Sequence, residues 1–274
     1  TLIDKKNLTV RVKNWFDFSD LNEYILHWKV TGDDGTVLAE GNKEVACEPH
    51  ATVELTLGAV QLPKTIREAY LDLGWTRKKS TPLVDTAWEI AYDQFVLPAS
   101  GKVWNGKPSE AGKTTFEVDE NTGALKSLCL DGEELLASPV TISLFRPATD
   151  NDNRDRMGAK LWRKAGLHTL TQKVVSLKES KTSATAQVNI LNVTGKKVGD
   201  ATLEYTLNHN GSLKVQTTFQ PDTTWVKSIA RLGLTFEMND TYGNVTYLGR
   251  GEHETYIDRN QSGKIGIYTT CLLY

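Results

Sequence analysis

Apolar and polar side chains alternate with a period of two through most of this sequence, and this alternation constrains the fold more than any other feature. Residues 8–12 read Leu-Thr-Val-Arg-Val, and residues 24–30 read Tyr-Ile-Leu-His-Trp-Lys-Val. Such alternation is typical of strands with one face buried and one face in water. Similar segments recur every ~10–15 residues with turn signals between them, which favours a β-sandwich. We therefore predict an all-β protein.

The first hundred residues contain enough strands for one small sandwich. The turn Gly32-Asp33-Asp34-Gly35 lies between two alternating segments and predicts a hairpin. Small and turn-forming residues at 98–101 follow the last of these segments, as expected of a linker between domains. We predict an immunoglobulin-like β-sandwich over residues 1–98. Its predicted strands are residues 8–12, 24–30, 36–41, 51–57, 68–75 and 87–97.

The remaining residues, 99–274, continue the same pattern and predict a second β-sandwich. The turn Asn208-His209-Asn210-Gly211 joins two of its strands, and residues 160–166 predict a short helix that ends at Gly166. The chain stops one strand after a turn at 259–263, so we expect this sandwich to be truncated. Its predicted strands are residues 114–119, 124–130, 133–136, 183–191, 201–207, 213–219, 229–236 and 244–248.

Composition argues against several classes of function. The 274 residues carry 32 basic and 34 acidic side chains, well mixed along the chain, for a formal charge of −2. This balance gives no reason to expect nucleic acid or a membrane surface as a partner. The three cysteines suit neither a disulfide framework nor a metal site, and we expect them to be half-buried thiols. The abrupt start at Thr1 and end at Tyr274 suggest an excerpt from a longer protein.

Three ordered motifs carry a more specific resemblance. The first is Asn14-Trp15-Phe16-Asp17-Phe18 followed by Leu26-His27-Trp28. The second is Phe145-Arg146-Pro147-Ala148-Thr149-Asp150-Asn151-Asp152. The third is Arg231-Leu232-Gly233-Leu234 followed by Tyr247-Leu248-Gly249-Arg250-Gly251-Glu252-His253-Glu254-Thr255-Tyr256. In this order and spacing they resemble the C-terminal half of the β-galactosidases of glycoside hydrolase family 2.

The resemblance covers essentially the whole chain and implies its domain organisation. Residues 1–98 would be the immunoglobulin-like domain that follows the catalytic barrel. Residues 99–274 would be the N-terminal part of the galactose-mutarotase-like sandwich called the small chain. The sequence departs from the family where Ala148 replaces a usual Pro and where the segment 251–256 lacks a usual Pro and Asn.

The resemblance also implies the activity and partners of the parent enzyme. That enzyme would hydrolyse terminal β-D-galactosides, with the substrate bound through the barrel that this chain lacks. Its Mg²⁺ and Na⁺ would bind mainly in the barrel, so no cofactor is expected in this chain. A bacterial-type homo-oligomer is implied, in the cytoplasm or the periplasm.

No catalytic residue is predicted in this chain. Retaining glycosidases place two carboxyl groups about 5–5.5 Å apart, and in this family both belong to glutamates of the barrel. The adjacent pair Glu133 and Glu134 would point to opposite faces of a strand and could not flank one sugar bond. By itself the chain is therefore expected to hydrolyse nothing.

Residues 150–155 form the one segment for which both a structural and a functional interpretation remain open. An EF-hand is excluded because Arg154, Asp155 and Leu161 occupy its fifth, sixth and twelfth positions. The segment is typical of a turn held by Asn and Asp side chains. The resemblance instead implies a loop at the edge of the galactose pocket, and the substrate-pocket residues would be Asp150, Asn151, Asp152, Asn153 and Arg154.

Histidine and tryptophan patterns give weaker hypotheses. His253 and Glu254 are adjacent, as an acid and base of a mutarotase could be, but the family uses this segment for packing. Trp28, Trp75 and Trp88 lie in strand patterns and are expected in the core, and the family's galactose-stacking Trp would lie beyond residue 274. Alternatives to a galactosidase fragment are a carbohydrate-binding module without hydrolase activity, a mutarotase and an adhesive sandwich.

Overall fold

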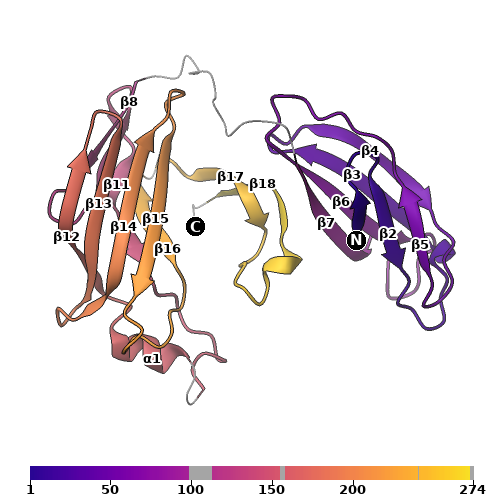
Figure 1. Ribbon diagram of the computed structural model, residues 1–274. Coiled ribbons are helices and arrows are strands. Elements are labelled where there is room, and N and C mark those ends of the chain that lie inside the picture. Colours follow the sequence, from indigo (N-terminus) through magenta and orange to yellow (C-terminus); the bar gives the residue numbers. More distant parts are fainter. Residues whose placement is uncertain (99–112, 155–157, 240, 272–274) are drawn as a thin grey trace. The chain divides into compact units, whose positions relative to one another are not determined.

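The computed structural model describes residues 1–98, 113–154, 158–239 and 241–271, and these residues form antiparallel β-sheets with little helix (Figure 1). The prediction of an all-β protein is confirmed. The chain divides into two compact units. The first holds Thr1–Trp104 and Gly243–Tyr274, and the second holds Asn105–Tyr242. Residues 99–101 of the predicted linker lie outside the described residues, and the domain boundary after residue 98 stays a prediction.

Two sheets and a separate hairpin make up the first unit. One sheet has the strand order β1-β2-β5 and the other β4-β3-β6-β7. The strands are β1 (Leu2–Asp4), β2 (Thr9–Lys13), β3 (Tyr24–Gly32), β4 (Val37–Glu44), β5 (Thr52–Thr56), β6 (Glu68–Arg77) and β7 (Glu89–Pro98). The hairpin consists of β17 (Asn244–Gly251) and β18 (Lys264–Cys271).

Period-two alternation decides which residues enter the first core. Leu26 and Val30 of β3 are fully buried, whereas the intervening Lys29 is exposed. Val10 of β2 and Leu71 of β6 belong to the same hydrophobic cluster, so the two sheets bury their inner faces against each other. The outer face of β4-β3-β6-β7 keeps polar residues.

The hairpin β17–β18 lies beside the outer face of this sheet. The side chain of Gln94 on β7 exchanges two hydrogen bonds with the backbone of Ile265, at 2.7 and 2.8 Å. Tyr92 donates a hydrogen bond from its hydroxyl to the carbonyl of Ser262 at 2.8 Å. These contacts extend the first unit beyond the seven strands of its two sheets with residues that come late in the chain.

The second unit also packs two sheets around one core. Its first sheet has the order β10-β9-β11-β16, with β8 also paired to β9, and its second sheet has the order β12-β13-β14-β15. The strands are β8 (Thr114–Val118), β9 (Leu125–Leu130), β10 (Glu133–Glu134), β11 (Leu136–Ser143), β12 (Leu170–Glu179), β13 (Ser183–Asn192), β14 (Lys197–Leu207), β15 (Leu213–Pro221) and β16 (Gly233–Met238).

Residues of both sheets fill the second core. Leu125 and Ile142 come from the first sheet, and Ile190 and Leu203 come from the second. Tyr205 is also buried here, and its hydroxyl donates a hydrogen bond to the carbonyl of Gly123 at 2.9 Å. Burial raises the pKa of Tyr205 to about 12, so the phenol remains a neutral donor.

Hairpin turns follow the sequence prediction closely. In the turn 208–211, the Asn208 amide donates to the Ser212 carbonyl at 2.9 Å and the Gly211 amide donates to the Asn208 carbonyl at 3.0 Å. Gly211 has a φ of 81°, which a residue with a side chain rarely adopts. A turn that ends on such a glycine matches the right-handed twist of the strands that it joins.

The helix α1 (Gly158–Ala165) begins two residues before the prediction and ends as predicted. Gly166 follows it with a φ of 71°. The Leu167 amide donates to the Trp162 carbonyl at 3.0 Å, and the Gly166 amide donates to the Arg163 carbonyl at 3.0 Å. This pair of bonds is a Schellman motif, which satisfies carbonyl groups that the helix leaves unpaired.

Several strands differ from the prediction. The strand β12 was not expected, because a bulge between Val174 and Ser176 interrupts its alternation. Only the first residue of β11 lies in a predicted strand, the segment 133–136. The rest of β11 was missed because Pro139 and two register shifts interrupt its alternation. The predicted strand 229–236 begins only at Gly233, because the Ala230 amide bonds to the Leu144 carbonyl outside any sheet. The strand β1 is only three residues long.

Candidate functional site

The loop between β11 and α1 is organised around the carboxylate of Asp152. The guanidinium of Arg146 binds it through two nitrogens, with Nη1–Oδ2 at 2.6 Å and Nη2–Oδ1 at 3.2 Å. Their side chains are only 16% and 17% exposed. Two parallel bonds of this kind fix direction as well as distance, so Asp152 holds the loop back against the sandwich.

Thr149 completes the set of donors to Asp152. Its amide and its hydroxyl both donate to Oδ2 at 2.8 Å. The Arg146 guanidinium, followed by the Thr149 amide, holds the pKa of Asp152 below its usual range. The carboxylate is therefore charged at neutral pH and saturated with partners inside the protein.

Backbone contacts join this loop to the helix. The Ala159 amide donates to the Asp152 carbonyl at 3.1 Å. The Asn153 side chain donates through Nδ2 to the Thr149 carbonyl at 3.1 Å, and its Oδ1 accepts from Arg163 at 3.4 Å. Asp152 and Asn153 thus serve the loop's own structure.

An aromatic cluster forms the base of the loop. Phe145 meets Trp162 edge to face, with ring centroids 6.5 Å apart, and the Arg146 guanidinium lies 5.3 Å from the Trp162 ring centre. Trp162 is 4% exposed and donates from Nε1 to the Ser228 hydroxyl at 2.9 Å. A Cβ at Gly158 would overlap this indole, so a glycine is needed where the helix begins. The loop therefore stands on a rigid support.

The predicted pocket residues fall into two groups. Asp152 and Asn153 are bound internally, as described above. Asp150, Asn151 and Arg154 are exposed, and their side chains bind no partner among the described residues. The structure thus brings a fixed turn and an exposed polar tip together in one loop. Residues 155–157, which follow the tip, lie outside the described residues.

The adjacent pair Glu133 and Glu134 binds separate partners. Glu134 accepts from the amides of Leu128 and Leu136 at 3.0 Å each and from the Ser127 hydroxyl. These bonds, that of Ser127 first, lower the pKa of Glu134 to about 2. Glu133 accepts instead from the Tyr242 hydroxyl at 2.8 Å. The two carboxylates are fixed in different directions, and Glu134 acts as a turn acceptor.

In the part of the chain that the structure describes, neither a metal centre nor a His253–Glu254 acid–base pair forms a second site. Within the described residues, no three His, Cys, Asp or Glu side chains gather as metal ligands. His253 is held in a turn, with Nδ1 against the Glu254 carbonyl and Nε2 against the Ser262 hydroxyl, at 2.8 and 2.9 Å. The expectation of half-buried thiols holds for Cys129 but not for the other two cysteines. Cys47 is buried in the first core, and Cys271 is exposed because it ends an edge strand of the β17–β18 hairpin.

One end of the first unit exposes aromatic side chains of the motif that begins at Asn14, and the sequence alone did not indicate that this motif forms an exposed surface. Asn14 is buried, donates from Nδ2 to the carbonyls of Ser19 and Cys47, and accepts from the Phe16 amide. These hydrogen bonds of Asn14 fold the segment 14–18 so that the side chains of Trp15 and Phe18 point outward, where they are 74% and 97% exposed. A largely apolar pocket of about 450 Å³ lies beside Trp15. Its lining includes Val12, Trp15, Phe16, Tyr24, Trp75 and Ile90.

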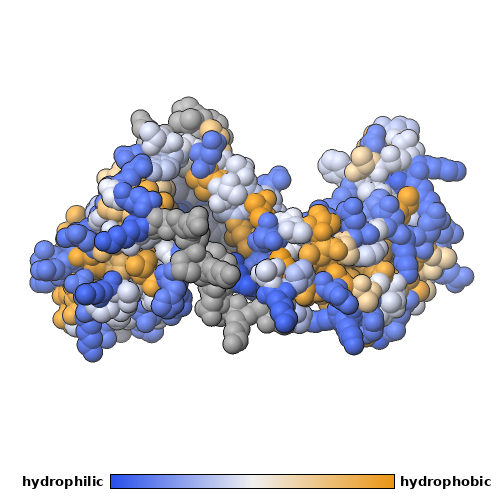
Figure 2. Space-filling view, turned by 90° about the horizontal axis from the view of Figure 1, so that it is seen from above, coloured by the Kyte–Doolittle hydropathy of each residue, from blue (hydrophilic) through white to orange (hydrophobic). Residues whose placement is uncertain are grey.

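The expected core position of Trp88 is wrong. It is 67% exposed, because β7 begins one residue later and the Trp88 amide closes a turn onto the Asp85 carbonyl at 3.2 Å. Trp28 and Trp75 pack against the first core as predicted. On the face seen in Figure 2, hydrophobic side chains reach the surface in patches among hydrophilic ones. In the described residues, no helix is long and apolar enough to cross a membrane.

Comparison with protein families gives two matches. A family described as "Beta galactosidase small chain" matches residues 110–272. A second, described as "Beta-galactosidase, domain 4", matches residues 10–98.

Curated relatives match nearly the whole chain. A protein named "Beta-galactosidase" from Priestia megaterium is 27% identical over an aligned length of 292 positions, and the alignment covers 98% of this chain and 27% of the relative. A protein of the same name from Actinobacillus pleuropneumoniae is 24% identical over 98% of this chain and 28% of its own length. The chain therefore spans about a quarter of the length of these relatives.

Among solved structures, an exo-chitosanase of Amycolatopsis orientalis aligns over 86% of this chain and 26% of its own, with 13% identity and a TM-score of 0.29. A score this low says nothing further about the fold or the site.

Proposed function

This chain belongs to the β-galactosidase small-chain family, and from that membership we propose that it is the non-catalytic, C-terminal portion of a longer β-galactosidase. The observation that carries the proposal is coverage: curated β-galactosidases match 98% of this chain over only 27% of their own length. Hydrolysis of terminal β-D-galactosides would then be the work of the longer protein.

Within the longer enzyme, the loop of residues 149–154 would border the sugar pocket. The Arg146–Asp152 pair and the Thr149 bonds hold the loop in one conformation. The same contacts leave the carboxylate of Asp150 and the amide of Asn151 exposed and without partners among the described residues. A carboxylate accepts hydrogen bonds from sugar hydroxyls, and an amide can donate or accept. A rigid loop with a polar tip therefore suits the rim of a sugar site.

The chain would also serve as a scaffold, and the aromatic end of its first unit supports that role. Trp15, Phe16 and Val84 border the apolar pocket at that end, and Trp15 is 74% exposed and Phe16 40% exposed. Exposed apolar clusters on a globular unit mark surfaces that are covered in the assembled protein. We assign the remainder of the longer β-galactosidase as the occupant, since about three quarters of the relatives' length lies outside this chain.

Two assays test the proposal. The isolated chain should not turn over a chromogenic galactoside, because its adjacent glutamates cannot act as a retaining pair, and measurable turnover would refute the proposal. In the longer enzyme, the double substitution Asp150→Ala with Asn151→Ala should raise KM for the galactoside about tenfold, as expected for loss of about 1.4 kcal/mol of hydrogen bonding.

The matched control is Glu120→Ala, which removes an exposed carboxylate from a turn of the same unit. It should leave KM unchanged. Equal KM values for the control and the double variant would remove the loop from the sugar pocket while leaving the small-chain assignment intact.

A further inference from the structure

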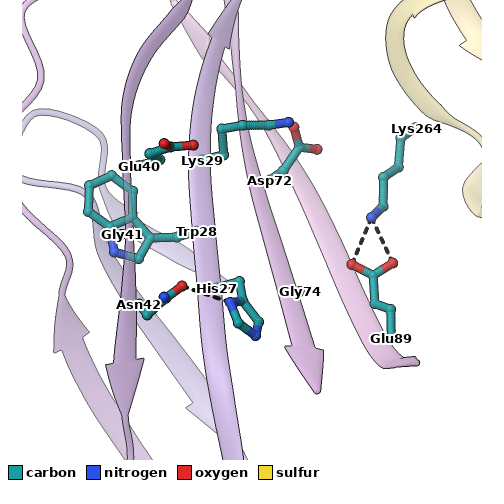
Figure 3. A pocket seen from close by; sticks show the side chains of 10 residues that line it. All are labelled: His27, Trp28, Lys29, Glu40, Gly41, Asn42, Asp72, Gly74, Glu89 and Lys264. Atoms are coloured by element: carbon teal, nitrogen blue, oxygen red, sulfur yellow. Dashed lines mark hydrogen bonds and ion pairs between the residues drawn. The ribbon is translucent and has the colours of Figure 1, made fainter. Parts of the chain in front are cut away.

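The outer face of the sheet β4-β3-β6-β7 forms a polar cavity of about 690 Å³, far in sequence from the loop at residues 149–154 (Figure 3). The registers of the strands place four side chains in one row across the sheet, namely Glu40, Lys29, Asp72 and Gln94. The next row on the same face contains Asn42, His27, Gly74 and Tyr92. Neighbouring positions in a row are ~4.8 Å apart, the distance between strands.

A network of hydrogen bonds fixes the second row. The Thr76 hydroxyl lies 2.8 Å from His27 Nε2, and His27 Nδ1 lies 2.7 Å from Asn42 Oδ1. If the Thr76 hydroxyl donates to Nε2, then Nδ1 carries the proton and donates to the amide oxygen of Asn42. This arrangement leaves the Asn42 amide nitrogen free to donate into the cavity.

The first row presents both acceptors and donors. Asp72 accepts from Gln94 through Oδ1 at 2.8 Å and keeps its second oxygen for another partner. Glu40 and Lys29 are exposed, and the positive charge of Lys29 acts on Asp72, where it lowers a pKa that burial raises overall. A carboxylate, an ammonium and a second carboxylate therefore follow one another across three strands.

A glycine and the hairpin give this face its concave shape. Gly74 has no side chain at the centre of the second row, and a Cβ there would overlap the carboxylate of Glu89. That carboxylate pairs with Lys264 of β18 at 2.8 Å, as Figure 3 shows. The ammonium of Lys264 also lies 4.6 Å from the ring centre of Tyr92. Glu89 and Lys264 form one wall of the cavity, and Tyr92 contacts Lys264 from outside the lining.

From this arrangement we propose that the cavity binds a neutral saccharide, through hydroxyls that bridge the carboxylates of Glu40 and Asp72 and the donors Lys29 and Asn42. A hydroxyl both donates and accepts, so adjacent hydroxyls match alternating carboxylates and donors. The lining has three carboxylates and two ammonium groups. One carboxylate, that of Glu89, and one ammonium group, that of Lys264, already form an ion pair. Neither an anion nor a cation is strongly favoured. The volume lies within the range of small-molecule sites.

The saccharide site does not rest on the proposed function, because a sandwich can bind sugar whether or not its parent is a galactosidase. Lactose and cellobiose are suitable probes, since both are neutral disaccharides. Titration calorimetry of the full chain at pH 7 should show saturable binding with a Kd of about 1 mM or below.

Two substitutions in the cavity locate the site, and a third substitution on the opposite sheet serves as the control. Glu40→Gln and Lys29→Met should each weaken binding about tenfold, because each removes a charged hydrogen-bonding group without touching the core. Glu54→Gln changes an exposed glutamate of the opposite sheet, paired with Arg11, and should bind as the parent chain does.

Three outcomes would overturn the inference. The first is the absence of saturation by either disaccharide at ten times the expected Kd. The second is binding that Glu40→Gln and Lys29→Met leave unchanged. The third is tighter binding of acetate or spermidine than of the disaccharides. Galactoside turnover by the longer enzyme should be unaffected by Glu40→Gln, so failure here is distinct from failure of the proposed function.

Discussion

Replacing Asp152 tests how the loop after β11 is held. Hydrogen bonds to charged groups contribute about 1.5–3 kcal/mol each in net terms. Asp152 accepts four, two from Arg146 and two from Thr149. Breaking a buried pair costs about 3–5 kcal/mol. Since this pair is about one-sixth exposed, we expect Asp152→Ala to lower the free energy of unfolding of the second unit by about 3 kcal/mol. Asp152→Asn should cost about half as much, because it keeps one acceptor oxygen.

The stability that the Asp152 carboxylate contributes should depend on pH, and the lowered pKa of Asp152 sets the direction of that dependence. The folded pKa lies below the ordinary value of 3.8. Stability from this group is therefore fully present above pH 3.8 and is lost as pH falls through the folded pKa. The difference between the parent chain and Asp152→Asn should stay constant from about pH 7 to about pH 5 and shrink below about pH 4.

Hydrogen exchange measured against urea separates the two units. Peptides from β13 report the second unit, and peptides from β3 report the first. The matched control is Asp150→Asn, which changes an exposed carboxylate two residues away and should shift stability by less than about 0.5 kcal/mol. Equal losses for Asp150→Asn and Asp152→Asn, or a difference that persists unchanged at pH 3, would refute the reasoning.

Three further substitutions probe the second unit. Leu203→Ala, at a position 1% exposed, should cost about 2–5 kcal/mol in urea unfolding because it leaves a cavity between the sheets; a cost below 1 kcal/mol would contradict the packing. Ser228→Ala should cost about 1–3 kcal/mol, since Trp162 Nε1 loses its acceptor inside the protein, and a red-shifted Trp162 fluorescence should accompany it. Gly211→Ala should cost about 1 kcal/mol from its left-handed φ, whereas Gly233→Ala, at a glycine of the same unit without a positive φ, provides the comparison.

The sequence predicts the fold well where alternation is uninterrupted. The strands β3, β6 and β13 appear within a few residues of their predicted limits, because one face of each is buried along its length. Where the pattern slips, prediction fails for a structural reason. The bulge in β12 places two residues opposite one residue of β13. Val174 and Val175 are adjacent apolar residues, and the period-two pattern that would predict a strand is broken at this point. Trp88 misleads for a related reason, because its apolar side chain extends the strand pattern backwards into the turn at Asp85, whereas β7 begins only at Glu89.

The loop at residues 149–154 shows what a motif by itself leaves undecided. A run of Asp and Asn predicts a turn, but it does not say which carboxylate faces inward. That choice depends on Arg146, which precedes the run by several residues and is oriented by Trp162 on the following helix. Only the folded chain brings these groups together, so the division between a bound Asp152 and an exposed Asp150 could not be read from spacing.

The same contacts explain why the departure of this sequence from the family motif is tolerated. Arg146, Thr149 and Asp152 make the bonds that close the loop, and within the described residues none of those bonds passes through Ala148. Ala148 instead packs its side chain against the second core. A proline there would restrict the backbone of the unfolded chain, but the folded loop takes its shape from the three polar residues. The closed turn therefore depends on Asp152 and its donors, and the residue at position 148 is free to vary as long as it can pack.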